Sequence, residues 1–463
     1  MKESRNRRRN NPFGQVPSSN RTVSLRWMSL GCIGLTAIGY MMVVSLFMAK
    51  NNHDTTPQTN ADTTITLAKR DNALPVPNQS SSKNILPAAG VTVGFAITVT
   101  GCGAESLTEA AAVLKHSIHL ASVHGNQGGR YDYVMYALYH PDGETCAMPL
   151  KDLGYELVRR ETPVQVEDIE GEYLRTSIRK NGCCGEKELV KLEAYTFVQH
   201  PIVVHLDLDV LVLKPLDPLF DWMLHDPDNI QPDYDVSNMH IMWPEKELPR
   251  KVNAFFTRDY NMVAVTRKHK PVQGGFLVLR PDLDVYNEFV SIIKKGDFRK
   301  NGGWGGIQGL FYGAMTFQGI IPYFYDILHP GDAVEVNRCV FNQMADNPKD
   351  QRTVNDIPQG RCRTGQDECE DCRNRPLSEI VTTHFTLCQK PWFCLPHDRD
   401  IIQQRLCRQL HHEWHRIRAD LEQSWGRPEL GPGAYQKKHF YGHCAAFGKN
   451  GYVPIQQPYG PSD

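Results

Sequence analysis

The sequence predicts an α/β fold in which a mixed, mostly parallel, Rossmann-like sheet is flanked by helices and preceded by one N-terminal membrane-spanning helix. From residue 91 onward, apolar β-branched runs alternate with segments of helical periodicity, as parallel strands alternate with the helices that connect them. Ahead of this part, residues 27–49 contain no charged side chain and are long enough to cross the ~30 Å hydrocarbon core of a bilayer.

The predicted elements follow one another from the first strand onward. A β-branched run that ends in glycine predicts a strand, and the helical spacing of the apolar residues after it predicts a helix. A second helix carries Lys191 and leads directly into a buried strand. In order, the predicted segments are the strand 91–103, the helix 104–123, the strand 131–139, the helix 188–198, the strand 202–206, and a strand, turn and helix within 274–296.

Residues 401–463 are predicted to form a helical appendage that packs on the main domain, residues 90–400. The stretch "DIIQQRLCRQLHHEWHRIRADLEQSW" has the periodicity of one amphipathic helix, and a Gly/Pro-rich tail follows it. His411 and His415 share one face of this helix. Because the order HExxH of a zinc protease is missing, we interpret both histidines as surface residues.

The flanks of the apolar span predict its orientation. Residues 1–26 contain Lys2 and several arginines, whereas Lys50 is followed by polar residues. The basic tail is therefore expected in the cytoplasm and the body of the chain on the other side of the membrane, as in a single-pass type II protein. A cleaved signal peptide is the alternative, although the apolar stretch is long for one. Residues 50–89 are rich in Thr, Asn, Ser and Pro, which predicts a flexible lumenal stem.

Cysteine usage fits an exported domain. The chain has 13 cysteines, and with Cys32 in the apolar span twelve remain, an even number. Disulfides are the expected state in an oxidising compartment. We expect the adjacent Cys183 and Cys184 to find separate partners. The pair Cys369 and Cys372 has zinc-ligand spacing, but a disulfide role is favoured over zinc.

Two carboxylates stand in the apolar stretch "PIVVHLDLDVLVLKPLD". Burying unpaired charge is costly, so Asp207 and Asp209 need a partner. Strand alternation would put both on one side of the chain, at the carboxyl end of a strand where α/β proteins bind ligands. A divalent cation would balance both charges and keep positions open for a diphosphate. The alternative is that one aspartate caps a turn while the other meets an arginine.

The block "KLEAYTFVQHPIVVHLDLDVLVLKPLDPLFD" resembles the core of glycosyltransferase family 8, the glycogenin-like nucleotide-diphospho-sugar transferases of GT-A fold. Three further stretches resemble motifs of that family in the same order. They are "GFAITVTGCGAESLTEAAAVLKHSI", "QGGFLVLRPDLDVYNEF" and "THFTLCQKPW". The resemblance covers roughly residues 91 to 395.

The resemblance implies a set of site residues. Asp207, Asp209 and His384 would bind Mn²⁺ (or Mg²⁺), and Lys390 would bind the donor diphosphate and assist its departure. Lys191 would lie near the donor sugar. The remaining implied positions are Gly274 and Gly275, under the sugar, and Gln308, a catalytic position that matches a family glutamine.

Three stretches depart from the family pattern. Ile307 stands where "GGDQG" would have an aspartate, "QGG" at 273–275 stands where "NSG" is usual, and Leu387 stands where a glycine is expected against the phosphates. Each candidate also has a structural alternative. His384 could be a buried histidine bonded to a backbone carbonyl, and the two glycines could mark a bulge.

The implied function is a metal-dependent retaining glycosyltransferase of the Golgi membrane with a lumenal catalytic domain. It would move a sugar from a UDP-sugar donor to a glycan, glycoprotein or small-molecule acceptor. The near balance of 51 basic and 52 acidic residues excludes nucleic acid as an expected partner. Two alternatives stay open: a non-catalytic, membrane-tethered relative that binds a sugar nucleotide or glycan, and a haloacid-dehalogenase-type phosphatase, whose nucleophile motif is also DxD.

Overall fold

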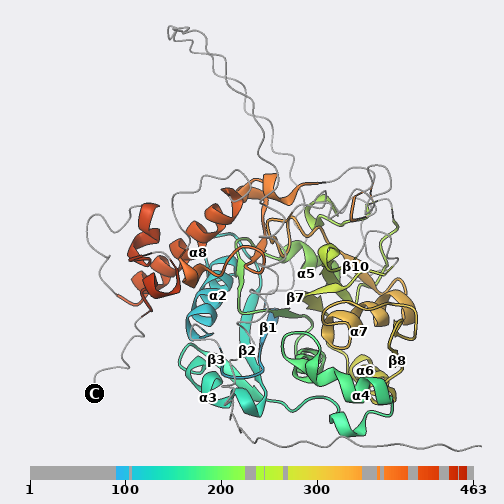
Figure 1. Cartoon of the computed structure of the whole chain (residues 1–463). Helices are drawn as coiled ribbons and strands as arrows, with labels where there is room; N and C mark the ends of the chain where they lie inside the picture. Colours follow the sequence, from blue (N-terminus) through green and yellow to red (C-terminus); the bar gives the residue numbers. More distant parts are fainter. Residues whose placement is uncertain are drawn as a thin grey trace, which may run out of the picture. The chain divides into compact units, whose positions relative to one another are not determined.

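The computed structural model describes residues 90–455, with gaps at 104–106, 225–235, 245, 264–268, 347–361, 365, 367–369, 395–404, 427–436 and 447. Its centre is a seven-stranded sheet in the order β10-β6-β7-β4-β1-β2-β3 (Figure 1). The strands are β1 (Thr92–Val99), β2 (Asp132–Tyr139), β3 (Tyr155–Arg159), β4 (Val203–Leu206), β6 (Ala254–Arg258), β7 (Val272–Leu279) and β10 (Ala333–Glu335).

The sheet is mixed and mostly parallel, as the sequence predicts. β1 pairs in parallel with β2 and β4, β2 with β3, and β6 with β10. β7 alone among these strands runs against its neighbours, β4 and β6. This arrangement is consistent with a GT-A fold.

Each face of the sheet is covered by its own set of helices. The side chains of Phe95 and Ile97 pack toward α2 (Leu107–Ala121) and α5 (Asp217–Leu224), whereas Ala96 faces the opposite core. Strand alternation explains this division, because neighbouring side chains of β1 point to opposite faces. The opposite core is closed by the 3₁₀ helix η5 (Gly185–Thr196), α6 (Leu283–Lys295) and α7 (Phe317–Tyr323).

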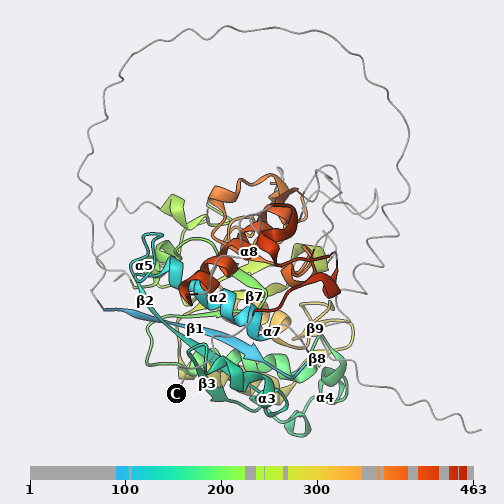
Figure 2. The ribbon, with the colours of Figure 1, turned by 90° about the vertical axis from the view of Figure 1, so that its left-hand side faces the viewer.

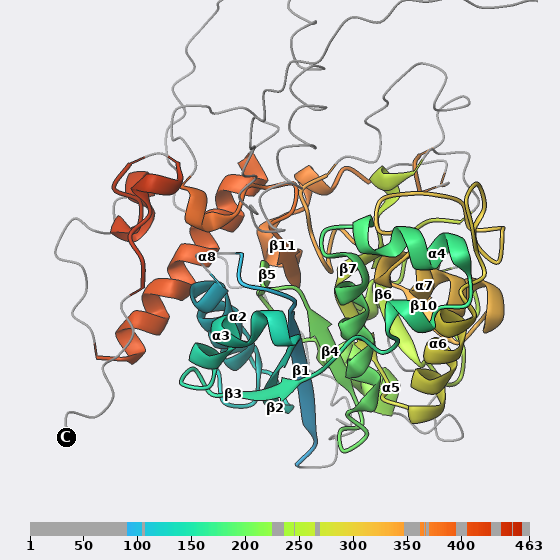
Figure 3. The same cartoon turned by 60° about the horizontal axis from the view of Figure 1, so that its bottom comes forward.

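The strand predicted around Asp207 is two strands. β4 ends at Leu206, and β5 (Val210–Val212) leaves the main sheet and pairs antiparallel with β11 (Thr382–His384). β5 and β11 lie side by side in Figure 3. The chain therefore turns between the two sheets at the DxD motif.

The C-terminal appendage is built on α8 (Arg405–Ser424), which lies along α2 in two views (Figures 1 and 2). Leu410, Trp414 and Ile417 pack with Trp392 and with Ala110 of α2. The prediction that His411 and His415 are surface residues is wrong, because both are fully buried. They border the apolar stripe of an amphipathic helix that is covered on this side, and sequence periodicity does not say how wide the covered stripe is.

Four disulfides join described cysteines. They are Cys102–Cys146, Cys339–Cys372, Cys388–Cys407 and Cys394–Cys444. The bond to Cys339 rules out the zinc alternative for Cys372. The prediction of separate partners for Cys183 and Cys184 is wrong, since both carry free thiols.

The predicted basic tail (1–26), membrane anchor (27–49) and stem (50–89) lie outside the described residues. Within the described ranges, no helix combines the length and apolar character needed to cross a bilayer.

The buried histidines of α8 predict a loss of stability in mild acid. Burial lowers the pKa of His411 to about 3 and the pKa of His415 well below its ordinary value. Both groups then take up protons on unfolding below pH 6.5, so stability is present near neutral pH and is lost as pH falls. Protonation of His411 in the unfolded chain should by itself lower the free energy of unfolding by about 1.4 kcal/mol as the pH falls from 7.5 to 5.5.

Urea denaturation at the two pH values measures this loss. The His411→Gln variant should lose part of the pH dependence, whereas His124→Gln should keep it, because the His124 side chain is half exposed. A pH dependence that is the same in the wild type and His411→Gln would contradict the prediction.

Candidate metal and donor site

The DxD motif is a turn at the end of β4. The amide of Asp207 donates to the carbonyl of Gly275 (3.2 Å), and the amide of Val210 donates back to the carbonyl of Asp207 (3.1 Å). The carbonyl of Asp209 accepts from the amide of Phe385 (2.9 Å). The two carboxylates converge because the backbone turns between them, whereas the sequence argument attributed this to strand alternation.

His384 reaches the motif through strand pairing. In the β5–β11 ladder His384 stands opposite Val210, the residue after Asp209. Its Nε2 lies 3.2 Å from Asp209 Oδ1 and 3.9 Å from Asp207 Oδ2. The pKa of His384 is lowered to about 4, chiefly by burial. The imidazole is therefore neutral near pH 7, the form that ligates a metal.

These three side chains fit a divalent cation. One ligand atom from each of Asp207, Asp209 and His384 lies within 4.8 Å of the others. Two carboxylate oxygens and one imidazole nitrogen suit Mn²⁺ or Mg²⁺, which prefer oxygen-rich sites. The structural alternative for His384 was a hydrogen bond to a backbone carbonyl. The structure does not show this bond, because the buried Nδ1 of His384 has no hydrogen-bond partner among the described residues.

Two lysines balance the aspartates. Lys191 Nζ lies 2.7 Å from Asp207 Oδ1 and 3.1 Å from the carbonyl of Gly274, and Lys390 Nζ forms an ion pair with Asp209. Burial opposes the charge on Asp207, but Lys191 and His384 outweigh it and lower the pKa of that carboxyl. Burial lowers the pKa of Lys390 to about 8. The partners of the partly buried aspartates are thus lysines, where the sequence-based alternative expected an arginine.

Gly275 makes room for His384. A Cβ on Gly275 would lie 2.4 Å from His384 Cε1 and 2.7 Å from its Nδ1, closer than side chains approach. A Cβ on Gly274 would make contacts of ordinary length, with Gln318 Cγ at 3.4 Å, Lys191 Nζ at 3.5 Å and Phe317 Cδ1 at 3.8 Å. Both glycines therefore lie beside the cluster, and Gly275 fixes the position of the imidazole.

Gln308 lies apart from the cluster. Its side chain is buried and donates from Nε2 to the carbonyl of Gly319 in α7 (2.7 Å). Its described contacts include none with the two aspartates or His384. The departures from the family pattern are exposed instead: Ile307 is 53 % and Leu387 38 % exposed.

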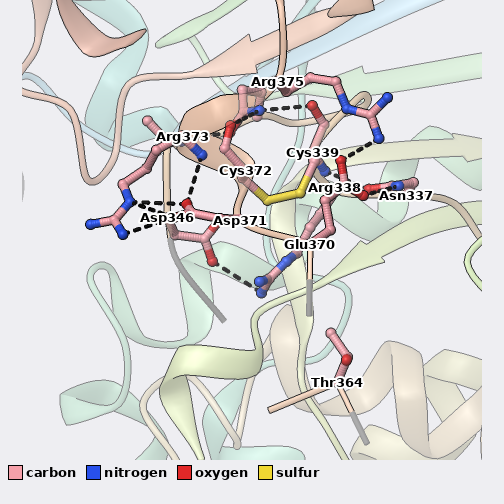
Figure 4. Close-up of a disulfide and its surroundings, with 12 residues drawn as sticks. Asn337, Arg338, Cys339, Asp346, Thr364, Glu370, Asp371, Cys372, Arg373 and Arg375 are labelled. Carbon is pink, nitrogen blue, oxygen red and sulfur yellow. Dashed lines mark hydrogen bonds and ion pairs between the residues drawn. A yellow bond between two sulfur atoms is a disulfide. The ribbon is translucent and has the colours of Figure 1, made fainter. Parts of the chain in front are cut away.

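Polar residues that the sequence did not single out hold β11 in place. Gln343 accepts at its backbone carbonyl from the amide of His384 (2.9 Å), and its Nε2 donates to the carbonyls of Cys339 (2.7 Å) and Cys372 (3.0 Å). Figure 4 shows the Cys339–Cys372 disulfide and the Glu370 carboxylate, which accepts from Asn337. Nothing in the local sequence marks Gln343, whose role depends on the pairing.

A second set of polar groups lies behind His384. Gln273 Oε1 accepts from the amide of Gly275 (2.6 Å) and from Asn342 Nδ2 (3.1 Å). Burial and the neighbouring Asp346 raise the pKa of the Asp259 carboxyl to about 6. Gln273 belongs to the "QGG" stretch that departs from the family pattern, whereas Asp259 and Asn342 come from segments that the sequence did not mark.

The Lys390 segment is fastened to the C-terminal appendage. His411 Nε2 lies 2.7 Å from the carbonyl of Gln389, and two disulfides, Cys388–Cys407 and Cys394–Cys444, bracket the "QKPW" loop. Trp392 lies 6.0 Å from Trp414 between ring centroids. The appendage thus holds the loop that carries the cationic end of the site.

The chain was compared with known proteins. No protein-family model and no curated protein matches it. Solved structures that match the chain include the bifunctional glycosyltransferase WbbM (11 % identity, TM-score 0.36), mouse xyloside xylosyltransferase 1 (13 %, 0.35) and the galactosyltransferase LgtC in complex with donor and acceptor sugar analogs (14 %, 0.33). The match to WbbM covers 66 % of this chain and 48 % of WbbM, so this chain spans about half the length of that protein. The match to the xylosyltransferase covers 64 % of this chain and 97 % of that protein, and the match to LgtC covers 75 % and 100 %. At this similarity, an assignment of function depends on the side chains of the site.

The close approach of Gly275 and His384 gives a testable prediction. Gly275→Ala should displace the imidazole and lower Mn²⁺ affinity by about tenfold or more, as expected when the support of a metal ligand is lost. Titration calorimetry with Mn²⁺ measures the affinity. Gly274→Ala is the matched control and should bind Mn²⁺ nearly as the wild type does. Equal affinities for wild type and Gly275→Ala would contradict the placement of His384.

Proposed function

We propose that this protein is a metal-dependent glycosyltransferase that transfers a sugar from a nucleotide-diphosphate donor to an acceptor. The observation that carries the proposal is the meeting of Asp207, Asp209 and His384 around a point bordered by two lysines. Three anionic or neutral ligands beside two cations are what a metal–diphosphate complex requires.

The proposed roles fall into metal binding by three residues and charge stabilisation or positioning by two lysines. Asp207, Asp209 and His384 would hold the cation, which supplies electrostatic stabilisation to the departing diphosphate. Lys390 is the second source of positive charge: released from Asp209, its ammonium would donate to phosphate oxygens. Lys191 stays within reach of the Gly274 carbonyl and orients the Asp207 carboxylate.

The pairing of each aspartate with a lysine explains how the site avoids isolated charge. The Asp207 carboxylate is about a third exposed and the Asp209 carboxylate less, and each has a lysine partner. A metal ion that displaces Lys390 from Asp209 would leave the lysine ammonium available to bind the diphosphate that accompanies the metal. Metal and donor should therefore bind cooperatively.

The finer assignments extend this proposal. Membership of glycosyltransferase family 8, a UDP-sugar donor and retention of anomeric configuration are supported by the ordered motifs around Asp207, Gly275 and Lys390. A site in the secretory pathway is supported by four disulfides, which persist in oxidising compartments. The membrane tether at residues 27–49, a type II Golgi topology, and a glycan, glycoprotein or small-molecule acceptor complete the proposal.

Calorimetry of the purified chain with UDP tests the donor site. UDP should bind more tightly with Mn²⁺ than without metal, and the Asp207→Asn/Asp209→Asn variant should lose this gain, a fall in affinity of about tenfold or more. Asp168→Asn, at an exposed position, is the matched control. Failure of the wild type to bind UDP with any divalent metal would refute the proposal.

The exposure of Ile307 favours a second candidate, a binding protein that holds a sugar nucleotide without transferring the sugar. Ile307 is 53 % exposed at a position where the family pattern has an aspartate. A transferase should slowly hydrolyse a suitable UDP-sugar when Mn²⁺ is present and the acceptor is absent, and Lys390→Met should lower that rate by about tenfold or more. Release of UDP measured over a panel of UDP-sugars separates the two. Metal-dependent binding without hydrolysis of any of them would favour the binding protein.

A further inference from the structure

Cys183 and Cys184 form an adjacent pair of free thiols beside the donor site. Among the described cysteines with an assigned state, they are the ones outside disulfides. Their Sγ atoms lie 2.8 Å apart, and both residues are partly exposed. Gly182 (φ 68°) and Gly185 (φ 61°) flank them in the left-handed region, so the backbone turns sharply on both sides of the pair.

A hydrogen bond connects Cys183 to Glu188, which lies in the same helix as the lysine that holds Asp207. The Cys183 thiol donates to Glu188 Oε1 (2.9 Å), and Thr316 Oγ1 donates to Glu188 Oε2 (2.5 Å). Glu188 is buried. Glu188 and Lys191 both belong to η5, and in a 3₁₀ helix residues at this spacing lie on the same side. Any change in the bonding of Glu188 therefore acts on the turn that places Lys191.

The second thiol faces the main sheet. Cys184 interacts with the Thr100 side chain, which directly follows β1. The carboxyl ends of β1 and β4 are where an α/β sheet of this kind binds its ligand. The thiol pair thus lies at the ligand-binding edge of the sheet.

We propose that Cys183 and Cys184 are a reversible oxidation site that closes to a vicinal disulfide and weakens donor binding. The inference rests on the proposed function for its effect on the donor, although the oxidation itself does not. The oxidant class is a low-molecular-weight disulfide such as oxidised glutathione. One thiolate attacks the oxidant's disulfide and releases one thiol. The other cysteine then displaces the second, so two electrons and two protons pass to the oxidant.

Oxidation would remove the hydrogen bond that the Cys183 thiol donates to Glu188. A disulfide has no S–H, so Glu188 Oε1 would lose its bond from Cys183 while staying buried, which is unfavourable for a carboxylate. We expect Glu188 to move toward solvent and the η5 turn to follow. Lys191 would then leave Asp207 and the carbonyl of Gly274. In the reduced state the lysine stays in place and the site is competent.

Mass spectrometry tests the oxidation site. The full-length chain is equilibrated over a series of reduced and oxidised glutathione ratios and alkylated with N-ethylmaleimide. The peptide that contains both thiols should change reversibly from the doubly alkylated form to an unalkylated disulfide. The Cys339–Cys372 disulfide is the internal control and should stay oxidised over the same series. Two adducts at every ratio, or a glutathione adduct in place of the internal bond, would overturn the proposal.

Calorimetry with UDP at the most reducing and the most oxidising glutathione ratios tests whether oxidation weakens donor binding. With Mn²⁺ present, UDP should bind about tenfold more weakly to the oxidised chain. The Cys183→Ser/Cys184→Ser variant keeps a hydroxyl donor for Glu188, so its affinity should match that of the reduced chain in both buffers. Oxidation with unchanged UDP affinity would overturn the link. If the reduced chain binds no UDP, the proposed function and the link fall together, and the mass measurement still decides whether the pair is an oxidation site.

Discussion

The antiparallel pairing of β5 with β11 is the constraint on which the rest of the site depends. It joins two segments far apart in the chain and sets His384 opposite the residue that follows the DxD motif. Gln343 holds the other edge of β11, and Gly275 leaves the space that the imidazole fills. Because three segments must meet before the histidine reaches the aspartates, the site exists only in the folded domain.

Charge compensation is the second organising requirement. Two partly buried carboxylates at one turn would repel each other, and each is stabilised by a lysine from a different part of the chain. Lys390 would compete with a metal ion for Asp209 and then complement a diphosphate, while Lys191 would keep orienting the Asp207 carboxylate. The same side chains thus suit the site with and without a bound metal and diphosphate, because a lysine side chain is long enough to change its ion-pair partner.

The appendage extends this organisation to the C-terminus. α8 buries its apolar stripe and two histidines against α2 and the loop that carries Lys390, and disulfides fasten that loop at both ends. Such cross-links restrict the unfolded chain more than they add contacts to the folded one. The free thiols at Cys183 and Cys184 differ from these structural cysteines in lying beside Lys191 and Glu188 rather than between distant segments.

The sequence by itself determined the α/β class, the elements β1, α2, β2, β4, β7 and α6, and the residue types suited to a metal site, because periodicity and residue type are local properties. The structure brings Asp207, Asp209, His384, Lys191 and Lys390 together, yet it places Gln308 against α7 and buries His411 and His415. Only the tertiary structure decided the turn after β4, the pairing of β5 with β11, the free state of Cys183 and Cys184, and the lysine partners of the aspartates. These features arise from contacts between segments distant in the chain, which local patterns do not encode.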